Sequence, residues 1–280
     1  MNPFIQPTSL PSHHSNMPDN PRSPSESSTQ IILEEVPPLY GGRRAPLSLN
    51  IIVVGAGMGG LAVTHTLAQA GHRITLLESA PAFGDVGAGI QISPNASRLL
   101  HRWGLGKALA AVAVEPTAVV FRRYDTGSRV GYTRWGTRIV EDHGSPNYQI
   151  HRGDYHSLLL RLALAAPDVR VQLDATVRDV QPDPTLPGGP SVTLASGEVL
   201  YADVIIGADG IKSTLQKAVT GLDDAPIPTG DAAYRAIIRT DSMLQDPELR
   251  QFVENPEATV WMAPERHITA YNIVSAVPFP

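Results

Sequence analysis

The stretch IIVVGAGMGGLAVTHTLAQAGHRITLLE, residues 51–78, decides the fold of this chain. Its branched apolar run, Ile51–Val54, predicts a parallel strand that is buried on both faces. Glycines in the G-x-G-x-x-G spacing follow, then a helical stretch over 61–70 and a second strand over 73–77 that ends at Glu78. This order of strand, glycine-rich turn, helix, strand and acid is typical of a dinucleotide-binding unit.

Each part of this fingerprint has a physical task. Gly55 permits the tight turn, Gly57 lets the backbone approach a pyrophosphate, and Gly60 lets the helix pack closely on the strand. The helix N-terminus offers free N–H groups and a partial positive charge to the phosphates. Glu78 can accept a hydrogen bond from a ribose hydroxyl. The alternative is a glycine-rich turn that serves packing alone.

Composition excludes several classes of protein. The chain has 280 residues and a net charge of -5, without a Lys/Arg cluster, so we expect no nucleic-acid partner. It has no cysteine, which excludes disulfides, thiolate metal sites and a Cys nucleophile, and no metal site is expected. No apolar run reaches the length of a membrane span, and no signal-peptide core lies near the start. We therefore expect a cytoplasmic protein.

The order of predicted elements indicates an α/β fold, with a Rossmann-like domain interleaved with a β-rich substrate lobe that is incomplete at its C-terminal end. Residues 1–47, rich in Pro, Ser and Asn, are expected to be a disordered tail, with at most a short ordered piece near 31–36. Residues 48–220 are assigned to the nucleotide-binding domain, with inserted strands at about 115–145 that belong to the lobe. Residues 221–280 form the partial lobe.

The remaining elements are expected from apolar runs and turn residues. Asp154 is expected to cap the N-terminus of the helix that follows it. Strands are expected over 118–125, 129–135, 169–180, 192–194, 199–201 and 204–206, and helices over 96–103, 155–165 and 212–219.

Four motifs, in their order and spacing, resemble one enzyme family. They are GAGMGG at 55–60 with Glu78, VGAGIQISPNA at 86–96, HRGDYHSLL at 151–159 and IIGADGIKS at 205–213. Together they resemble the single-component FAD-dependent aromatic hydroxylases, the salicylate hydroxylase-like group A flavoprotein monooxygenases. The resemblance covers about residues 49–275, and the last three motifs are more specific than the fingerprint alone.

The resemblance implies a set of cofactor-binding residues. Gly55, Gly57 and Gly60 would hold the FAD pyrophosphate, and Glu78 the adenosine ribose. It also implies that Arg152 would reach FAD. Asp209 would contact FAD where NADH or NADPH docks transiently. Gly89 and Ile90 would lie near the flavin ring. Two simpler interpretations stay open: Arg152 could pair with Asp154, and Asp209 could belong to a strand-ending turn.

The chain departs from the family pattern in two respects. Gln216 stands near the place where family members commonly carry an Arg. The sequence GDAAY at 230–234 looks like the family's second Gly-Asp motif, but it comes only about 20 residues after GADG and runs into RAIIRTD, where the family has a strand of the substrate sheet. We therefore interpret it as a different segment, and expect a C-terminally truncated member with impaired activity.

The implied reaction is hydroxylation of a small aromatic substrate with NAD(P)H and O₂ through a C4a-hydroperoxyflavin. Weak candidates for groups that face the substrate are Arg235, Tyr234, His267 and Tyr271, each of which could equally be a packed or solvated residue of the sheet. Two other interpretations compete: a catalytically inactive fragment that binds nucleotide, and another flavin or NAD oxidoreductase that shares only the fold. The substrate, the choice of NADH or NADPH and the oligomeric state stay undetermined.

Overall fold

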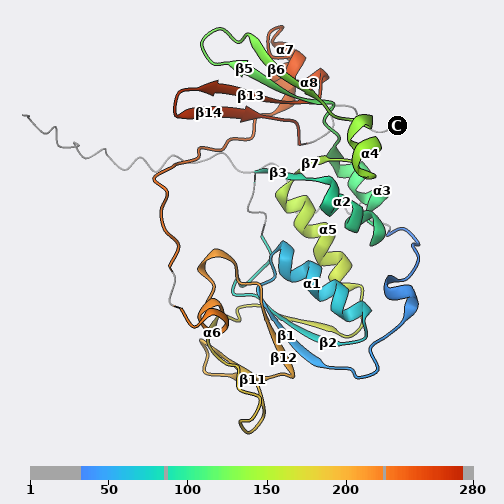
Figure 1. Ribbon diagram of the computed structural model, residues 1–280, viewed down its shortest axis with the longest axis vertical. Helices are drawn as coiled ribbons and strands as arrows, with labels where there is room; N and C mark the ends of the chain where they lie inside the picture. Colours follow the sequence, from blue (N-terminus) through green and yellow to red (C-terminus); the bar gives the residue numbers. More distant parts are fainter. Residues whose placement is uncertain (1–32, 85–87, 223–224, 274–280) are drawn as a thin grey trace, which may run out of the picture. The chain divides into compact units, whose positions relative to one another are not determined.

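The computed structural model describes residues 33–84, 88–222 and 225–273. Its centre is a four-stranded parallel sheet in the order β12-β1-β2-β8 (Figure 1). The strands are β1 (Asn50–Val54), β2 (Arg73–Leu77), β8 (Val169–Gln172) and β12 (Val204–Gly207). Strand β1 lies between β2 and β12, so the glycine-rich turn that follows β1 lies at the middle of one sheet edge.

Two helices cover one face of this sheet. Helix α1 (Met58–Gln69) and helix α5 (Arg152–Leu164) pack against each other, and α1 also packs on β2 (Figure 1). Leu61, Leu158 and Leu159 are almost completely buried in this layer. The predicted β1-helix-β2 unit is confirmed, with β2 matching the expected range and α1 beginning three residues earlier than expected.

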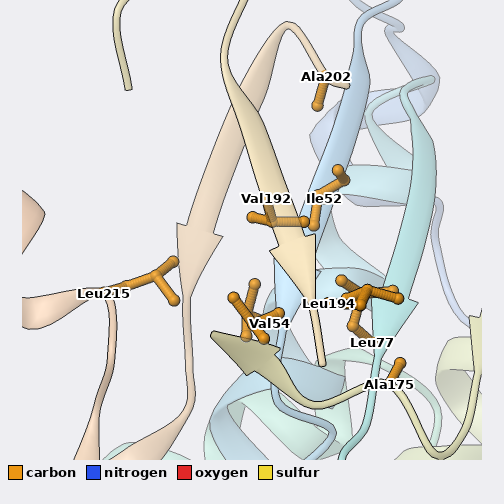
Figure 2. Packing of buried hydrophobic residues seen from close by; sticks show 9 residues of the cluster. Ile52, Val54, Leu77, Ala175, Val192, Leu194, Ala202 and Leu215 are labelled. Atoms are coloured by element: carbon orange, nitrogen blue, oxygen red, sulfur yellow. The ribbon is translucent and has the colours of Figure 1, made fainter. Parts of the chain in front are cut away.

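A small antiparallel sheet, in the order β11-β10-β9, contributes the other half of the core. Its strands are β9 (Val177–Gln181), β10 (Ser191–Leu194) and β11 (Val199–Tyr201). Figure 2 shows Val192 and Leu194 of β10 beside Ile52 and Val54 of β1. Because Ile51 and Val53 alternate with these residues and are also buried, β1 is buried on both faces, as its continuous apolar run predicts.

Two further sheets complete the described architecture. One has the order β3-β7-β4, and the other β14-β13-β5-β6, in which β5 and β13 are parallel although far apart in sequence. Their strands are β3 (Gly89–Ile92), β4 (Ala113–Val114), β5 (Ala118–Arg123), β6 (Arg129–Arg134), β7 (Tyr148–His151), β13 (Glu257–Ala263) and β14 (Arg266–Ala270). The assignment of residues 115–145 and 221–280 to a substrate lobe stays a prediction.

The remaining helices are short. They are η1 (Leu39–Gly42), α2 (Pro94–Arg102), α3 (Gly106–Val112), α4 (Thr137–His143), η2 (Gly210–Lys212), α6 (Gln216–Thr220), α7 (Thr240–Gln245) and α8 (Gln251–Glu254). Among the residues that the structure describes, no helix is both long and apolar enough to cross a membrane.

Several expected boundaries are wrong. Asp154 does not cap α5, because the helix already begins at Arg152 and His151 occupies the capping position. The strand expected over 169–180 is divided into β8 and β9, and the turn between them contains Asp174 with a φ of 54°. The helix expected over 212–219 is divided into η2 and α6. RAIIRTD, residues 235–241, forms no strand.

The expected disorder up to residue 47 is also wrong for its last part, because residues 33–47 contact the folded chain. Residues 1–32 lie outside the described structure. The contacts are made mainly to carbonyl groups at the ends of α1 and α2: Glu34 N–H to Gly104 O (2.9 Å), Tyr40 Oη to Thr66 O (3.3 Å) and Ala45 N–H to Ala70 O (2.7 Å). The bonds to Gly104 O and Ala70 O use carbonyls just beyond the helix ends, whereas Thr66 O also accepts from Ala70 N–H (3.1 Å) within α1.

Deletion of residues 1–47 should therefore destabilise the chain relative to deletion of residues 1–32. The longer deletion removes the three bonds above, and we expect a loss of about 1–3 kcal/mol in the free energy of unfolding. Urea denaturation of both deletion variants measures this difference. Equal midpoints for the two variants would show that residues 33–47 contribute nothing to stability.

Candidate functional site

The glycine-rich turn brings three backbone segments into contact at the carboxyl ends of β1 and β12. Gly55 has a φ of 99°, a conformation that favours glycine, and a Cβ there would lie 2.4 Å from Ala208 O. A Cβ at Gly60 would lie only 1.8 Å from Gly55 O. Both positions therefore require glycine for packing within the protein, and the turn holds the start of α1 against the ends of both strands.

Gly57 differs from these two glycines because a Cβ at this position would point into open space. Apart from Gly57 itself and its two chain neighbours, no described residue has an atom within 4 Å of the position that a Cβ would occupy there. Gly57 is the N-cap of α1, and the helix start has no side-chain cap among the described residues. The open space and the uncapped N–H groups fit a bound phosphate group.

Glu78 holds two loops together at the end of β2. Its Oε2 accepts a hydrogen bond from Ala56 N–H (2.9 Å), and its Oε1 accepts bonds from Ala80 N–H (2.9 Å) and Ser79 Oγ (3.2 Å). Partial burial acts to raise the pKa of Glu78, but these bonds outweigh burial and leave its pKa below the ordinary value. The carboxylate is therefore ionised at neutral pH and organises the fingerprint turn, while its remaining lone pairs can accept from a ribose.

Asp209 lies beside the same turn, since a Cβ at Gly55 would be 3.0 Å from Asp209 Cα. Its carboxylate accepts three hydrogen bonds, from Ser213 Oγ (2.7 Å), Thr214 N–H (2.6 Å) and Leu215 N–H (3.3 Å). Asp209 therefore shapes the strand-ending turn, which was the simpler of the two interpretations. Contact between this loop and FAD stays a prediction.

The β3-β7-β4 sheet brings Gly89 and Arg152 together. Gly89 pairs with His151 in the register of β3 and β7, and Arg152 N–H donates to Ala88 O (3.1 Å). Ile90 is the next residue of β3 and pairs with Ile150. Of the family motif that begins at Val86, residues 86 and 87 lie outside the described structure.

Tyr271, which follows β14, covers Gly89. A Cβ at Gly89 would lie 2.5 Å from Tyr271 Cε2. Burial raises the pKa of the Tyr271 phenol, and the positive charge of Arg235 partly opposes this. Tyr234 and Arg235 are both exposed outside any strand, and His267 is an exposed residue of β14.

Two side chains near these residues were not predicted. Gln149 is completely buried and, by the register of β3 and β7, lies on the same face of the β3-β7-β4 sheet as Gly89. Its side-chain amide has no hydrogen-bond partner among the described residues. His156 places its Nε2 2.8 Å from Ala56 O of the fingerprint turn. The spacing from Arg152 to His156 was the available signal, because residues four apart share a helix face.

Comparison with known proteins identifies the family. Residues 48–277 match the family described as FAD binding domain. The chain belongs to this family of FAD-dependent monooxygenases. It is 38% identical over 237 residues to the FAD-dependent monooxygenase OpS4 of Beauveria bassiana, covering 83% of this chain and 53% of the relative.

Two further comparisons agree. The chain is 37% identical over 224 residues to the 3-amino-4-hydroxybenzoate 2-monooxygenase PtnB3 of Streptomyces platensis, covering 80% of this chain and 53% of that protein. The fold matches the crystal structure of CtdE in complex with FAD, with a TM-score of 0.61 and 20% identity, over 77% of this chain and 53% of CtdE. The chain spans about half the length of the curated relatives it matches.

FAD is thus the cofactor of this family, and the described residues fit it. The open space at Gly57 and the uncapped start of α1 suit the diphosphate, and Glu78 suits the ribose. The resemblance seen in the sequence is confirmed. The assignment of individual residues to FAD stays a prediction.

Gly57→Val should abolish FAD binding without loss of stability. The new side chain would enter open space in the protein but would occupy the place of the phosphate. Flavin absorbance after gel filtration, together with thermal unfolding, checks both parts. As a contrast, Gly60→Ala should lower stability by at least about 2 kcal/mol, because its Cβ collides with the Gly55 carbonyl. Wild-type flavin content in Gly57→Val would contradict the assignment.

Glu78→Ala should weaken FAD binding by about 1–3 kcal/mol and also reduce stability. The stability that Glu78 provides should be present above its unfolded pKa of about 4.5 and be lost as the pH falls through its lower folded pKa, because protonation removes the acceptor charge. Calorimetric titration with FAD and urea denaturation between pH 3 and 7 measure the two effects. A folded variant with unchanged FAD affinity would show that Glu78 is only a charge at the end of a strand and does not contribute to FAD binding.

Proposed function

We propose that this chain is the FAD-binding portion of an NAD(P)H-dependent monooxygenase that hydroxylates a small aromatic substrate. The observation that carries the proposal is the Gly57 opening, bordered by the uncapped N-terminus of α1 and the ionised Glu78, in a chain that belongs to a family of FAD-dependent monooxygenases. The named relative that acts on 3-amino-4-hydroxybenzoate supports an aromatic substrate. When bound, FAD supplies the redox chemistry, in which NADH or NADPH is the reductant and O₂ the oxidant.

The residues of the chain would then act as follows. The N–H groups at the start of α1 and the Arg152 guanidinium would offset the negative charge of the cofactor diphosphate. Gly55, Gly60 and Asp209 would keep the turn in the shape that admits the diphosphate. Gly89 and Ile90 would border the flavin ring.

On the substrate side, three residues are our candidates. Gln149 is a buried amide on the Gly89 face of the β3-β7-β4 sheet that has no side-chain hydrogen-bond partner within the described part of the chain. Such a group is costly unless a ligand or water completes its hydrogen bonds. Tyr271 covers Gly89, and the positive charge of Arg235 acts on the pKa of its phenol. A phenol and a guanidinium are suited to bind a phenolate or carboxylate on an aromatic ring. Tyr234 and His267 are also candidates, and both are exposed, as Arg235 is.

The 280-residue chain itself should hydroxylate inefficiently. Residues 225–239 form no helix or strand, every residue of β14 is exposed, and Ile268 is 68% exposed. Efficient oxygen transfer needs a site that is shielded from water. We therefore expect NAD(P)H oxidation that yields hydrogen peroxide in place of hydroxylated product.

The test is NAD(P)H oxidation with a panel of phenols and benzoates, with peroxide and product measured in parallel. Substrate-stimulated oxidation with peroxide as the main product supports the proposal. One hydroxylated product per NAD(P)H would show that the described site is already closed to water. A protein that binds no FAD would favour the inactive-fragment interpretation.

A further inference from the structure

Helix α5 contacts the fingerprint turn through the side chain of His156. Its Nε2 lies 2.8 Å from Ala56 O, although the two residues are 100 positions apart in sequence. A carbonyl oxygen can only accept, so Nε2 carries a proton and donates it. The ring is half-buried and lies 5.8 Å from the Phe83 ring, in a tilted arrangement that restricts its rotation.

The other side of Ala56 is held by Glu78. The Ala56 N–H donates to Glu78 Oε2 (2.9 Å), while the Ala56 carbonyl accepts from His156. These two groups belong to consecutive peptide planes, one on each side of the Ala56 Cα. A carboxylate from β2 and an imidazole from α5 therefore fix both backbone angles of Ala56.

This arrangement determines where the next N–H group points. In a trans peptide the C=O and N–H groups point in opposite directions. The bond from His156 to the Ala56 carbonyl therefore directs the Gly57 N–H away from His156. Gly57 is the residue whose Cβ position is open, at the uncapped start of α1.

We propose that His156 is a positioning residue for the FAD diphosphate: its hydrogen bond to the Ala56 carbonyl orients the Gly57 N–H toward the phosphate oxygens. The inference rests on the proposed FAD site and adds a residue of α5 to it. A purely packing role for the imidazole would depend on the shape of the ring alone, whereas the positioning role depends on the donated proton.

Two substitutions separate these roles. H156F keeps a ring against Phe83 but cannot donate, whereas H156Q loses the ring and retains an N–H donor of similar reach. H143F is the matched control, because His143 is an exposed residue at the end of α4. FAD and ADP, which share the diphosphate, are titrated into each variant by fluorescence quenching and calorimetry, and thermal unfolding verifies the fold.

We expect H156F to bind both FAD and ADP about tenfold more weakly than the wild type. H156Q should recover to within about threefold, and H143F should match the wild type. Wild-type affinity in a folded H156F variant would overturn the inference, and so would an H156Q variant as weak as H156F. If H156F does not fold, H156A takes its place in the same comparison.

The proposed function and this inference fail in distinguishable ways. Absence of FAD binding by the wild-type chain would reject both. Normal FAD binding by the wild type together with unaffected H156F would reject only the role of His156. Loss of FAD binding without loss of ADP binding in H156F would place the effect at the flavin side and would also contradict the diphosphate role.

Discussion

The structure depends on backbone-to-backbone packing at Gly60, Gly55 and Ala208. A Cβ at Gly60 or Gly55 would lie within 2.4 Å of a carbonyl oxygen, so no other residue fits at either position without movement of the backbone. This packing sets the start of α1 directly over the ends of β1 and β12. The same edge of the sheet consequently receives Asp209 from the loop after β12 and Glu78 from the end of β2, and both lie beside the open space at Gly57.

The parts of the fold that were predictable from sequence are those that local chemistry determines. The run Ile51–Val54 is buried on both faces because it lies between α1 and the β9–β11 sheet. A strand in that position needs apolar residues on both faces, so its sequence is a continuous apolar run. By contrast, the helix expected over 212–219 is interrupted because the Asp209 carboxylate binds the N–H groups of Thr214 and Leu215. The contacts of residues 33–47 are made largely through backbone groups, which leave no signal in composition.

The same distinction applies to the site. Glu78 and the three fingerprint glycines follow from spacing, because each acts within one βαβ unit. His156 and Gln149 could not be assigned, since their significance depends on which distant segments α5 and β7 contact in the folded chain. Tyr234 was a candidate because it lies in the segment expected to form the substrate lobe, and its full exposure shows that sequence position alone does not bring it to the other residues.

The central claim is that the Gly57 opening, with Glu78 beside it, binds the diphosphate and ribose of FAD. Equilibrium dialysis of the purified chain against FAD, with and without excess ADP, tests this claim most directly. We expect saturable binding of one FAD per chain that ADP displaces, because both ligands occupy the same opening. Flavin binding that ADP does not reduce, or no saturable binding at any soluble FAD concentration, would contradict it.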